Sequence, residues 1–489
     1  MPDAAAASFC LRLDAKSWPG LRRHSGLKAI QAGRASRQQA EIVLVDTPAR
    51  TLAELGWLCL SENDQPHLLA LAQGKVLPNP DIEALGNLAI LARGKLERLV
   101  LPLSGSRRLL LEKYELAVKR KPASLAVLRC DGFTAAEAAA WLLELAGDPA
   151  APGLKFGLLG SEPGVALAAM LGLAAPKPVK APELPSQIPA GDSAIAAACA
   201  ILRHCLLQFD ANIQPVLLGQ DSEGVHQMRV ALRRLRSALD IFAAILPAGW
   251  LAAMLDDLRW LNTPLGQRRD LDVFVEETLA PLRVAQPDLA GLGQLNKLLD
   301  TRRLAAQADL VVALQSPRAT AALLRLRWLA ALDEAEILRQ LEPAQHEAAL
   351  LPAISFAALS LKKRRRKLKQ LGERHAELTV PELHRLRIRA KKLRYASDFF
   401  RYLFAKKPSK LAGITLARLQ DTLGALNDAA VGDQLLKGLL GPVDQDPAAA
   451  AIAGWFAARQ AAQLAQLGPA WQDYARLKPF WKAALPESA

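Results

Sequence analysis

The sequence predicts a mainly α-helical protein, in which a C-terminal pair of pseudo-symmetric four-helix bundles is preceded by a smaller α+β domain. Residues 191–489 consist of long Ala/Leu/Arg segments that Pro or Gly interrupts at intervals suited to helices. Two blocks of this region also recur at one offset, which indicates two copies of one helical unit. Residues 1–175 instead hold short β-prone runs bounded by turn-forming residues.

The N-terminal 175 residues predict a sheet with one clear helix. Thr134–Gly147 is expected to be helical because Thr134 and Glu137 have the spacing of a capping box. Five prolines in Pro176–Pro189 indicate a semi-rigid linker, which we place at residues 176–190. The runs with strand character are Ser8–Asp14, Glu41–Asp46, Leu55–Ser61, His67–Ala72, Leu96–Leu103 and Arg107–Lys119.

The positive charge is concentrated in one part of the chain. The whole chain has a net charge of +14, and the stretch Ser355–Lys410 alone holds 18 Lys/Arg against 4 Asp/Glu. This local excess predicts an acidic partner. Aromatic residues make up only 5% of the chain, which argues against a base-stacking surface for single-stranded nucleic acid.

Cysteine usage and the chain start favour a cytoplasmic protein without membrane insertion. The five cysteines are scattered and form no CxxC pair, so a disulfide scaffold or a cysteine zinc site is not expected. The first residues lack the charged-then-apolar order of a signal peptide. The longest apolar stretch that we identify, Gly164–Pro176, is too short to span a bilayer.

An internal repeat carries the functional argument. Val225–Phe242 aligns without a gap with Leu383–Phe400 at an offset of 158, and the same offset matches Leu258–Val273 with Leu416–Val431. In the second pair of blocks, we interpret the shared Gly as a close packing contact and the shared Asp as a helix cap. Two blocks with one offset imply two copies of a unit with room for about four helices.

Each copy presents a stripe of cations on one helix. At helical spacing His226, Arg229, Arg233 and Arg236 share a face, and His384, Arg387, Lys391 and Arg394 share the equivalent face. Asp221 is expected to cap the first helix, and Thr379, in capping-box spacing with Glu382, is expected to cap the second. Leucines and alanines on the adjacent arc are expected to fix each helix against the core. Such a stripe, roughly 15 Å long, suits a linear polyanion, because Arg binds phosphate oxygens bidentately and the polyanion releases condensed counterions.

The cationic run Lys362–Lys369 precedes the second stripe and is expected to form a second wall of the same groove, with Lys362 and Arg366 as ligands. No P-loop, carboxylate pair or metal-ligand spacing lies near either His, so we expect no catalytic residue, no metal site and no cofactor. A polyanion beside the histidines would favour imidazolium, so binding should strengthen as pH falls.

The segments HQMRVALRRLRSAL and LHRLRIRAKKLRYASDFF, followed by LGQRRDLDV and LGALNDAAV, closely resemble the conserved histidine α-helical domain family (CHAD) over roughly Ser193–Trp481. The resemblance implies two four-helix bundles, binding of inorganic polyphosphate on a basic central surface, and association with polyphosphate granules. It implies binding at His226, Arg229, Arg233, His384, Arg387 and Lys391, with Arg234, Arg236, Lys392 and Arg394 as further ligands.

The N-terminal part resembles a degenerate triphosphate-tunnel (CYTH) domain, through VDTP at Val45–Pro48 and LGWLCL at Leu55–Leu60. The candidate metal-binding strand, Phe9–Lys16, lacks the glutamates that a tunnel enzyme needs. We therefore expect a polyphosphate binder that is not an enzyme. Non-specific nucleic-acid binding is the main alternative, and a phosphohydrolase acting on polyphosphate or triphosphate is a weaker one.

Overall fold

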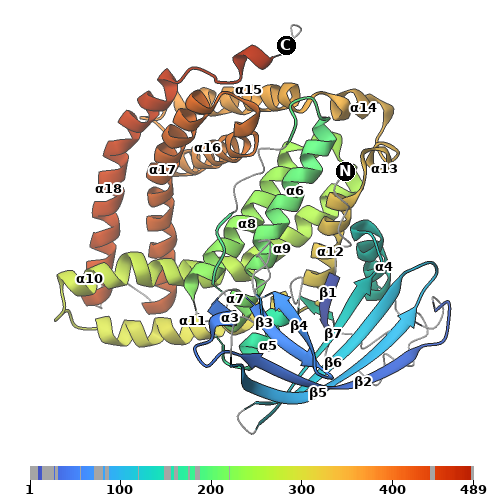
Figure 1. Ribbon diagram of the computed structural model, residues 1–489. Helices are drawn as coiled ribbons and strands as arrows, with labels where there is room; N and C mark the ends of the chain where they lie inside the picture. Colours follow the sequence, from blue (N-terminus) through green and yellow to red (C-terminus); the bar gives the residue numbers. More distant parts are fainter. Residues whose placement is uncertain are drawn as a thin grey trace.

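A curved antiparallel sheet and a helical region share the chain, as the sequence predicts (Figure 1). The protein is mainly helical, and a smaller domain containing the sheet precedes the helical region. The computed structural model describes residues 9–13, 27, 31–54, 57–70, 81–82, 87–118, 121–147, 156–158, 163–173, 177–181, 188–219, 221–440 and 447–485.

The sheet has the strand order β4-β3-β2-β5-β6-β7-β1-β8, and all paired neighbours are antiparallel. Each predicted run overlaps one of these strands, whereas β7 and β8 were not predicted. In β7, Leu125 and Val127 are buried on one face and Ala126 and Leu128 on the other, so the sequence shows no alternation. The strands are β1 (Phe9–Leu13), β2 (Ser36–Asp46), β3 (Trp57–Glu62), β4 (Gln65–Ala70), β5 (Ala89–Pro102), β6 (Arg108–Val118), β7 (Lys121–Asp131) and β8 (Phe156–Leu158).

Short helices cover both faces of the sheet. The predicted helix is α4 (Ala135–Gly147), and its capping box is confirmed: Thr134 Oγ1 accepts a hydrogen bond from the Glu137 amide at 3.2 Å, and the Glu137 carboxylate accepts one from the Thr134 amide at 2.9 Å. The short α3 (Thr51–Glu54) lies beside β3, and α5 (Gly164–Met170) packs against the core on the face opposite α4.

The helical region shows the repeat in its element boundaries. Helices α8 and α16, the short 3-10 helices η3 and η5, and helices α9 and α17 begin 158 residues apart. The first copy consists of α6, α8, α9 and α11, and the second of α15, α16, α17 and α18. The elements, in chain order, are α6 (Ala194–Ala211), α7 (Ile213–Leu218), α8 (Ser222–Ile241), η3 (Ala243–Ile245), α9 (Ala248–Phe274), η4 (Val275–Leu279), α10 (Ala280–Ala285), α11 (Leu292–Leu314), α12 (Pro317–Ala331), α13 (Glu334–Leu338), α14 (Pro343–Leu350), α15 (Ala353–Gly372), α16 (Val380–Phe400), η5 (Arg401–Leu403), α17 (Lys406–Leu440), α18 (Pro447–Arg476) and η7 (Lys482–Ala484).

Equivalent phenylalanines of the two copies touch one another. Phe242 and Phe400 occupy matching positions, are fully buried, and pack edge-to-face with their ring centroids 5.9 Å apart. Phe356 stacks on Phe242 at 5.3 Å. Since equivalent residues can meet only near the axis that relates two copies, this pair marks the pseudo-two-fold axis between α8 and α16.

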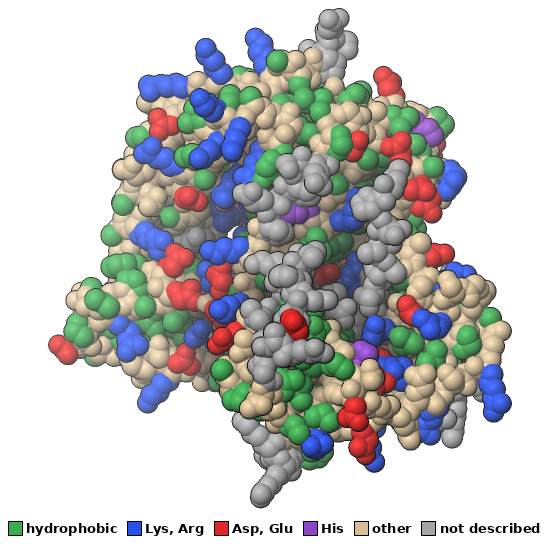
Figure 2. Space-filling model, in the orientation of Figure 1, with side chains coloured by type: hydrophobic (Ala, Val, Ile, Leu, Met, Phe, Trp, Pro, Cys, Tyr) green, Lys and Arg blue, Asp and Glu red, His purple; other side chains and the backbone are tan. Residues whose placement is uncertain are grey.

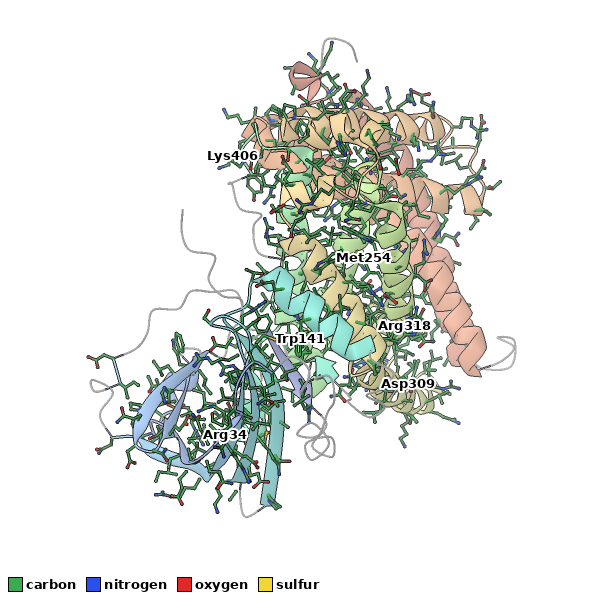
Figure 3. The ribbon with its side chains drawn as sticks, turned by 90° about the vertical axis from the view of Figure 1, so that its right-hand side faces the viewer. Arg34, Trp141, Met254, Asp309, Arg318 and Lys406 are labelled. Carbon is green, nitrogen blue, oxygen red and sulfur yellow. The ribbon has the colours of Figure 1, made fainter. Side chains whose placement is uncertain are left out.

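Helix α12 joins the helical region to the N-terminal domain. It packs against α4, and its Leu324 and Trp328 belong to the apolar core under the sheet (Figure 3, where Trp141 marks α4). In the predicted linker 176–190, the described residues 177–181 and 188–190 form neither helix nor strand, and Val179 exchanges backbone hydrogen bonds with the Asn212 side chain. The domain boundaries themselves stay a prediction.

One apolar segment is longer than the sequence analysis recognised. Ala194–Leu218, which forms α6 and α7, is long and apolar enough to cross a membrane, in contrast to the shorter stretch Gly164–Pro176. Within that candidate, 67% of the most apolar window is buried inside the protein. Core helices commonly have this composition, because a helix that is apolar on most sides can be covered by other helices.

Candidate functional site

Helix α8 holds the first row of cations in a fixed orientation. Asp221 caps the helix by accepting a hydrogen bond from the Glu223 amide at 2.8 Å, as the sequence predicts. Met228, Leu232 and Leu235 are fully buried on the core side. The cations at the margin of this buried face therefore extend from a rigid helix rather than from a loop.

Helix α16 holds the second row in the same way. Its predicted capping box is present, because the Thr379 amide donates to Glu382 at 3.0 Å and the Thr379 side chain meets the N3 amide. Leu386, Ala390 and Leu393 are buried beneath the cations. The two stripe helices contact each other, so their rows approach one another at the pseudo-two-fold axis.

Both rows open into one cavity of about 620 Å³, which we call the central cavity. Elements of both copies surround it, and Figure 2 shows a hollow on this face with Lys and Arg side chains gathered beside it. The remaining polar walls come from α9, η4, α17 and α18. Its charged and imidazole side chains are His226, Arg229, Arg233, Arg236, Arg269, Asp270, Glu277, Arg387, Lys391, Asp421 and Arg459.

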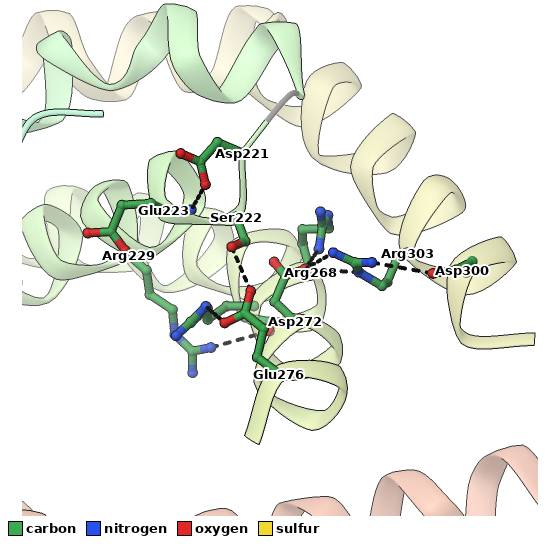
Figure 4. Close-up of polar contacts among 11 residues, drawn as sticks. Asp221, Ser222, Glu223, Arg229, Arg268, Asp272, Glu276, Asp300 and Arg303 are labelled. Carbon is green, nitrogen blue, oxygen red and sulfur yellow. Dashed lines mark hydrogen bonds and ion pairs between the residues drawn. The ribbon is translucent and has the colours of Figure 1, made fainter. Parts of the chain in front are cut away.

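Part of the central cavity is charge-paired by the protein itself. Arg229 forms an ion pair with Asp270 at 2.7 Å, and Arg459 pairs with Glu277 at 3.1 Å. Arg269 pairs with Glu276 at 3.2 Å, and Glu276 also accepts from Ser222 at the start of α8 (Figure 4). These pairs tie α8 and α18 to the α9–η4 segment.

Three other cations of the cavity take part in no ion pair described for the chain. None of the described ion pairs involves Arg233, Arg236 or Lys391, although Arg233 Nε donates to the Tyr395 hydroxyl at 3.3 Å. The Nε of Arg229 is buried and meets no hydrogen-bond acceptor in the described part of the chain. Seven Lys/Arg side chains against three carboxylates line the cavity, which makes it electropositive.

The surroundings of Lys391 lower the pKa of its amine. Burial, followed by repulsion from the guanidinium groups of Arg233, Arg387, Arg229 and Arg236, lowers the pKa of Lys391 to about 7. Those four arginines come from both copies of the repeat. An anion among them would favour the charged amine and raise this pKa again.

The pKa of His226 is lowered as well. Burial lowers its pKa below the ordinary histidine value, and the nearby Arg269, Arg233 and Arg229 lower it further, against an opposing effect of Glu223. An anion in the central cavity would therefore also favour the imidazolium form of His226.

Comparison with known proteins identifies this arrangement. The family model described as "CHAD domain" matches residues 200–437. The crystal structure of the CHAD domain from the plant Ricinus communis aligns with a TM-score of 0.52 and 32% sequence identity, over 62% of this chain and 98% of that chain. The chain belongs to the CHAD family. The CHAD domain therefore contains both stripe helices and most of the walls of the central cavity.

Two curated relatives match over a shorter range. Uncharacterised proteins of two strains of Mycobacterium tuberculosis, CDC 1551 / Oshkosh and ATCC 25618 / H37Rv, are each 30% identical over 179 residues. The aligned part is 36% of this chain and 34% of each relative. The chain thus spans about a third of the length of these relatives.

The CHAD domain brings together only part of the predicted site. His226, Arg229, Arg233, Arg236, Arg387 and Lys391 line the central cavity. His384 and Arg394 are not among the residues that line it: His384 is exposed, and Arg394 lies 3.8 Å from Asp398, one turn further along α16. The cations of the two copies are therefore placed symmetrically near the axis but not at the ends of the stripes.

Two other predicted ligands have different surroundings. Arg234 is buried, donates to Gln208 Oε1 at 2.8 Å, and lies over the ring of Phe399, so it packs between helices. Lys392 turns to another groove and pairs with Asp240 at 2.9 Å. Adjacent positions on a helix point about 100° apart, which separates both residues from their cavity-lining neighbours.

The run Lys362–Lys369 does not form a wall of the central cavity. Lys362 and Arg366 are exposed on α15 and are not among the cavity-lining residues. Arg364 contacts Asp240, and Arg365 donates to the Leu477 carbonyl at 2.6 Å. The run therefore lies outside the central cavity, where Lys363, Arg364 and Lys367 line another groove, and the role of Lys362 and Arg366 as ligands stays a prediction.

Carboxylates in the central cavity were missed by the sequence analysis. Asp270 was interpreted as a cap, but it lies inside α9 and holds Arg229; its counterpart Asp428 lies outside the described side chains. Gly266 is not required sterically, because an added Cβ would lie 3.9 Å from the Arg229 Cζ. The Asp that recurs at the offset of 158 was the sequence feature that could have indicated a carboxylate in the central cavity. No described group of three or more His, Cys, Asp or Glu is placed to hold a metal ion.

Proposed function

We propose that the CHAD domain binds inorganic polyphosphate in the central cavity, without catalysing its breakdown, and that the protein is cytoplasmic and associates with polyphosphate granules. The observation that carries the proposal is the convergence of Arg233, Arg236 and Lys391, from both copies, without carboxylate partners in the described chain. A polyphosphate chain would supply closely spaced negative charge to these cations and would release its condensed counterions.

The concave shape favours a thin chain over a nucleic-acid duplex. The cations lie on the walls of a cavity between helices rather than on a protruding helix that could enter a groove. The aromatic residues of the lining offer little to bases. Phe274 and Phe456 are buried and pack on each other with ring centroids 6.0 Å apart, and the Tyr395 ring stacks on Phe399 at 6.5 Å.

Competition distinguishes the two ligands. We expect long-chain polyphosphate, titrated against the full-length protein in a series of salt concentrations, to outcompete duplex DNA at equal charge concentration. Displacement of polyphosphate by DNA would support nucleic-acid binding instead. Metal-dependent release of phosphate from tripolyphosphate by the purified chain would support the phosphohydrolase alternative.

The lowered pKa of Lys391 predicts a pH-dependent affinity. In the free protein the amine loses its proton around pH 7, whereas bound polyphosphate favours the protonated form. Binding therefore takes up a proton above that pH, and affinity should fall by up to about tenfold per pH unit as pH rises from about 7 towards 9. Protonation of His226 should raise the affinity for polyphosphate further at lower pH, since the pKa of His226 is also lowered.

The matched variant for this prediction is Lys391→Arg, which keeps the charge but does not titrate in this range. Its affinity, measured in the same buffers by isothermal titration calorimetry, should be nearly flat between about pH 7 and 9. Equal pH slopes for the wild type and Lys391→Arg would remove Lys391 protonation from the mechanism.

The position of Asp270 predicts that removal of its charge strengthens polyphosphate binding. Its carboxylate lines the central cavity and occupies Arg229, so it competes with phosphate for that guanidinium. Asp270→Asn keeps a hydrogen-bond acceptor but removes the negative charge, and should raise polyphosphate affinity by about threefold to tenfold at moderate salt. Unchanged or weaker binding by Asp270→Asn would place the bound chain away from Arg229.

A further inference from the structure

A second groove lies between α15 and α16, outside the central cavity. Its volume is about 770 Å³, and cations of both helices line it together with the C-terminal end of α8. The lining includes Lys363, Arg364, Lys367, Arg385, Arg389 and Lys392. Three cations of the run Lys362–Lys369 and three cations of α16 thus meet in this groove, and none of the six lines the central cavity.

Its charge is only partly balanced by the protein. Asp240 is the one carboxylate among the described residues of the lining, and it contacts both Arg364 and Lys392. None of the described ion pairs involves Lys363 or Lys367. The groove is therefore open to an anionic partner.

An apolar floor distinguishes this groove from the central cavity. Phe356, Leu359 and Ile388 line it, and Ile388 is 40% exposed. Such a floor does not favour polyphosphate binding, because phosphate oxygens that lie over apolar carbons find neither a hydrogen-bond donor nor a cation there. A flat bilayer would not reach the floor of a concave groove.

The cations also follow helical spacing. Lys363 and Lys367 lie one turn apart on α15, as do Arg385 and Arg389 on α16. Side chains one turn apart are separated by about 6 Å. A helix with acidic side chains at the same spacing and leucines on its other stripe would match both the charges and the floor.

We propose that this second groove is a docking site for an acidic, amphipathic helical segment of a protein partner. The apolar stripe of that helix covers Ile388 and its neighbours, and its carboxylates meet the lysines and arginines of α15 and α16. The inference does not depend on polyphosphate binding, because no cation of the central cavity takes part in it.

A synthetic peptide tests the proposal on the full-length protein. The probe is a fluorescein-labelled helix with leucines at i, i+3 and i+7 and glutamates one turn apart, compared with a scrambled isomer of the same composition. We expect fluorescence anisotropy to show binding of the ordered peptide, and Ile388→Glu to weaken it by about tenfold or more.

Lys363→Met/Lys367→Met serves as a second variant, because both changes lie at a helix surface and leave the core intact. It should also weaken peptide binding, whereas Arg233→Gln/Arg387→Gln/Lys391→Met should not. The proposal is overturned if the ordered peptide does not bind, if its scrambled isomer binds equally well, or if binding survives both groove variants. The proposal is also overturned if polyphosphate displaces the ordered peptide equally well from the wild type and from Ile388→Glu. That result would mark the groove as a second polyanion surface.

Discussion

The variant Arg233→Gln/Arg387→Gln/Lys391→Met should lose polyphosphate affinity by about 100- to 1,000-fold at moderate salt. The three side chains line one cavity and come from both copies of the repeat. The slope of log affinity against log salt should also become shallower by about two, since three cations no longer release counterions. Helicity measured by circular dichroism should not change, because the substituted side chains lie outside the buried stripe.

The matched control is Lys362→Met/Arg366→Gln/Lys369→Met, which removes the same charge from α15 outside the central cavity. We expect this control to lose affinity by only about threefold, through the weaker general field of the protein. Equal losses in the two variants would mean that net charge, rather than the central cavity, determines binding.

Phe400→Ala should destabilise the helical region by about 3–5 kcal/mol. Phe400 is fully buried and meets Phe242, its equivalent in the other copy, and Phe356. Removing its ring leaves a void at the axis between the copies, where packing also sets the approach of the two cation rows. The urea midpoint followed by far-ultraviolet circular dichroism measures the change.

Leu207→Ala is the control for this change, because Leu207 lies on α6 in the same region but is 49% exposed. It should alter stability by no more than about 0.5 kcal/mol. A loss below about 1 kcal/mol in Phe400→Ala would show that the contact between the copies contributes little to the fold.

The sequence was sufficient for features that depend on local pattern. Capping residues at Thr134, Asp221 and Thr379 predicted three helix starts, since a cap needs only one side chain and its neighbouring amides. The offset of 158 predicted the repeat because two copies of one unit retain matching positions in the chain. The strand β7 escaped prediction because burial on both faces removes the alternation that marks a strand.

The site was predicted less completely because it depends on how helices are placed. Helical spacing put Arg236 and Arg394 in equivalent positions, yet only Arg236 lines the central cavity. The run Lys362–Lys369 lies near α16 in the chain, but packing places Lys363, Arg364 and Lys367 in another groove. Asp270 is distant in sequence from Arg229, and only the packing of α9 on α8 brings them together.

A cluster of like charges makes the unliganded CHAD domain less stable than a neutral core of the same size would be. Burial first, and repulsion from the neighbouring arginines second, lower the pKa of Lys391, and a bound polyanion would oppose that repulsion. This explains why the cations are held on capped, well-packed helices: rigid support keeps them together when no ligand compensates them.

The most direct measurement compares half-site variants by isothermal titration calorimetry with a short polyphosphate. One variant carries Arg233→Gln/Arg236→Gln from the first copy, and the other carries Arg387→Gln/Lys391→Met from the second. If one chain occupies the central cavity between the copies, each variant binds more weakly than the wild type while the stoichiometry stays one chain per protein. Two chains on the wild type, with either variant keeping one chain at undiminished affinity, would contradict a shared site.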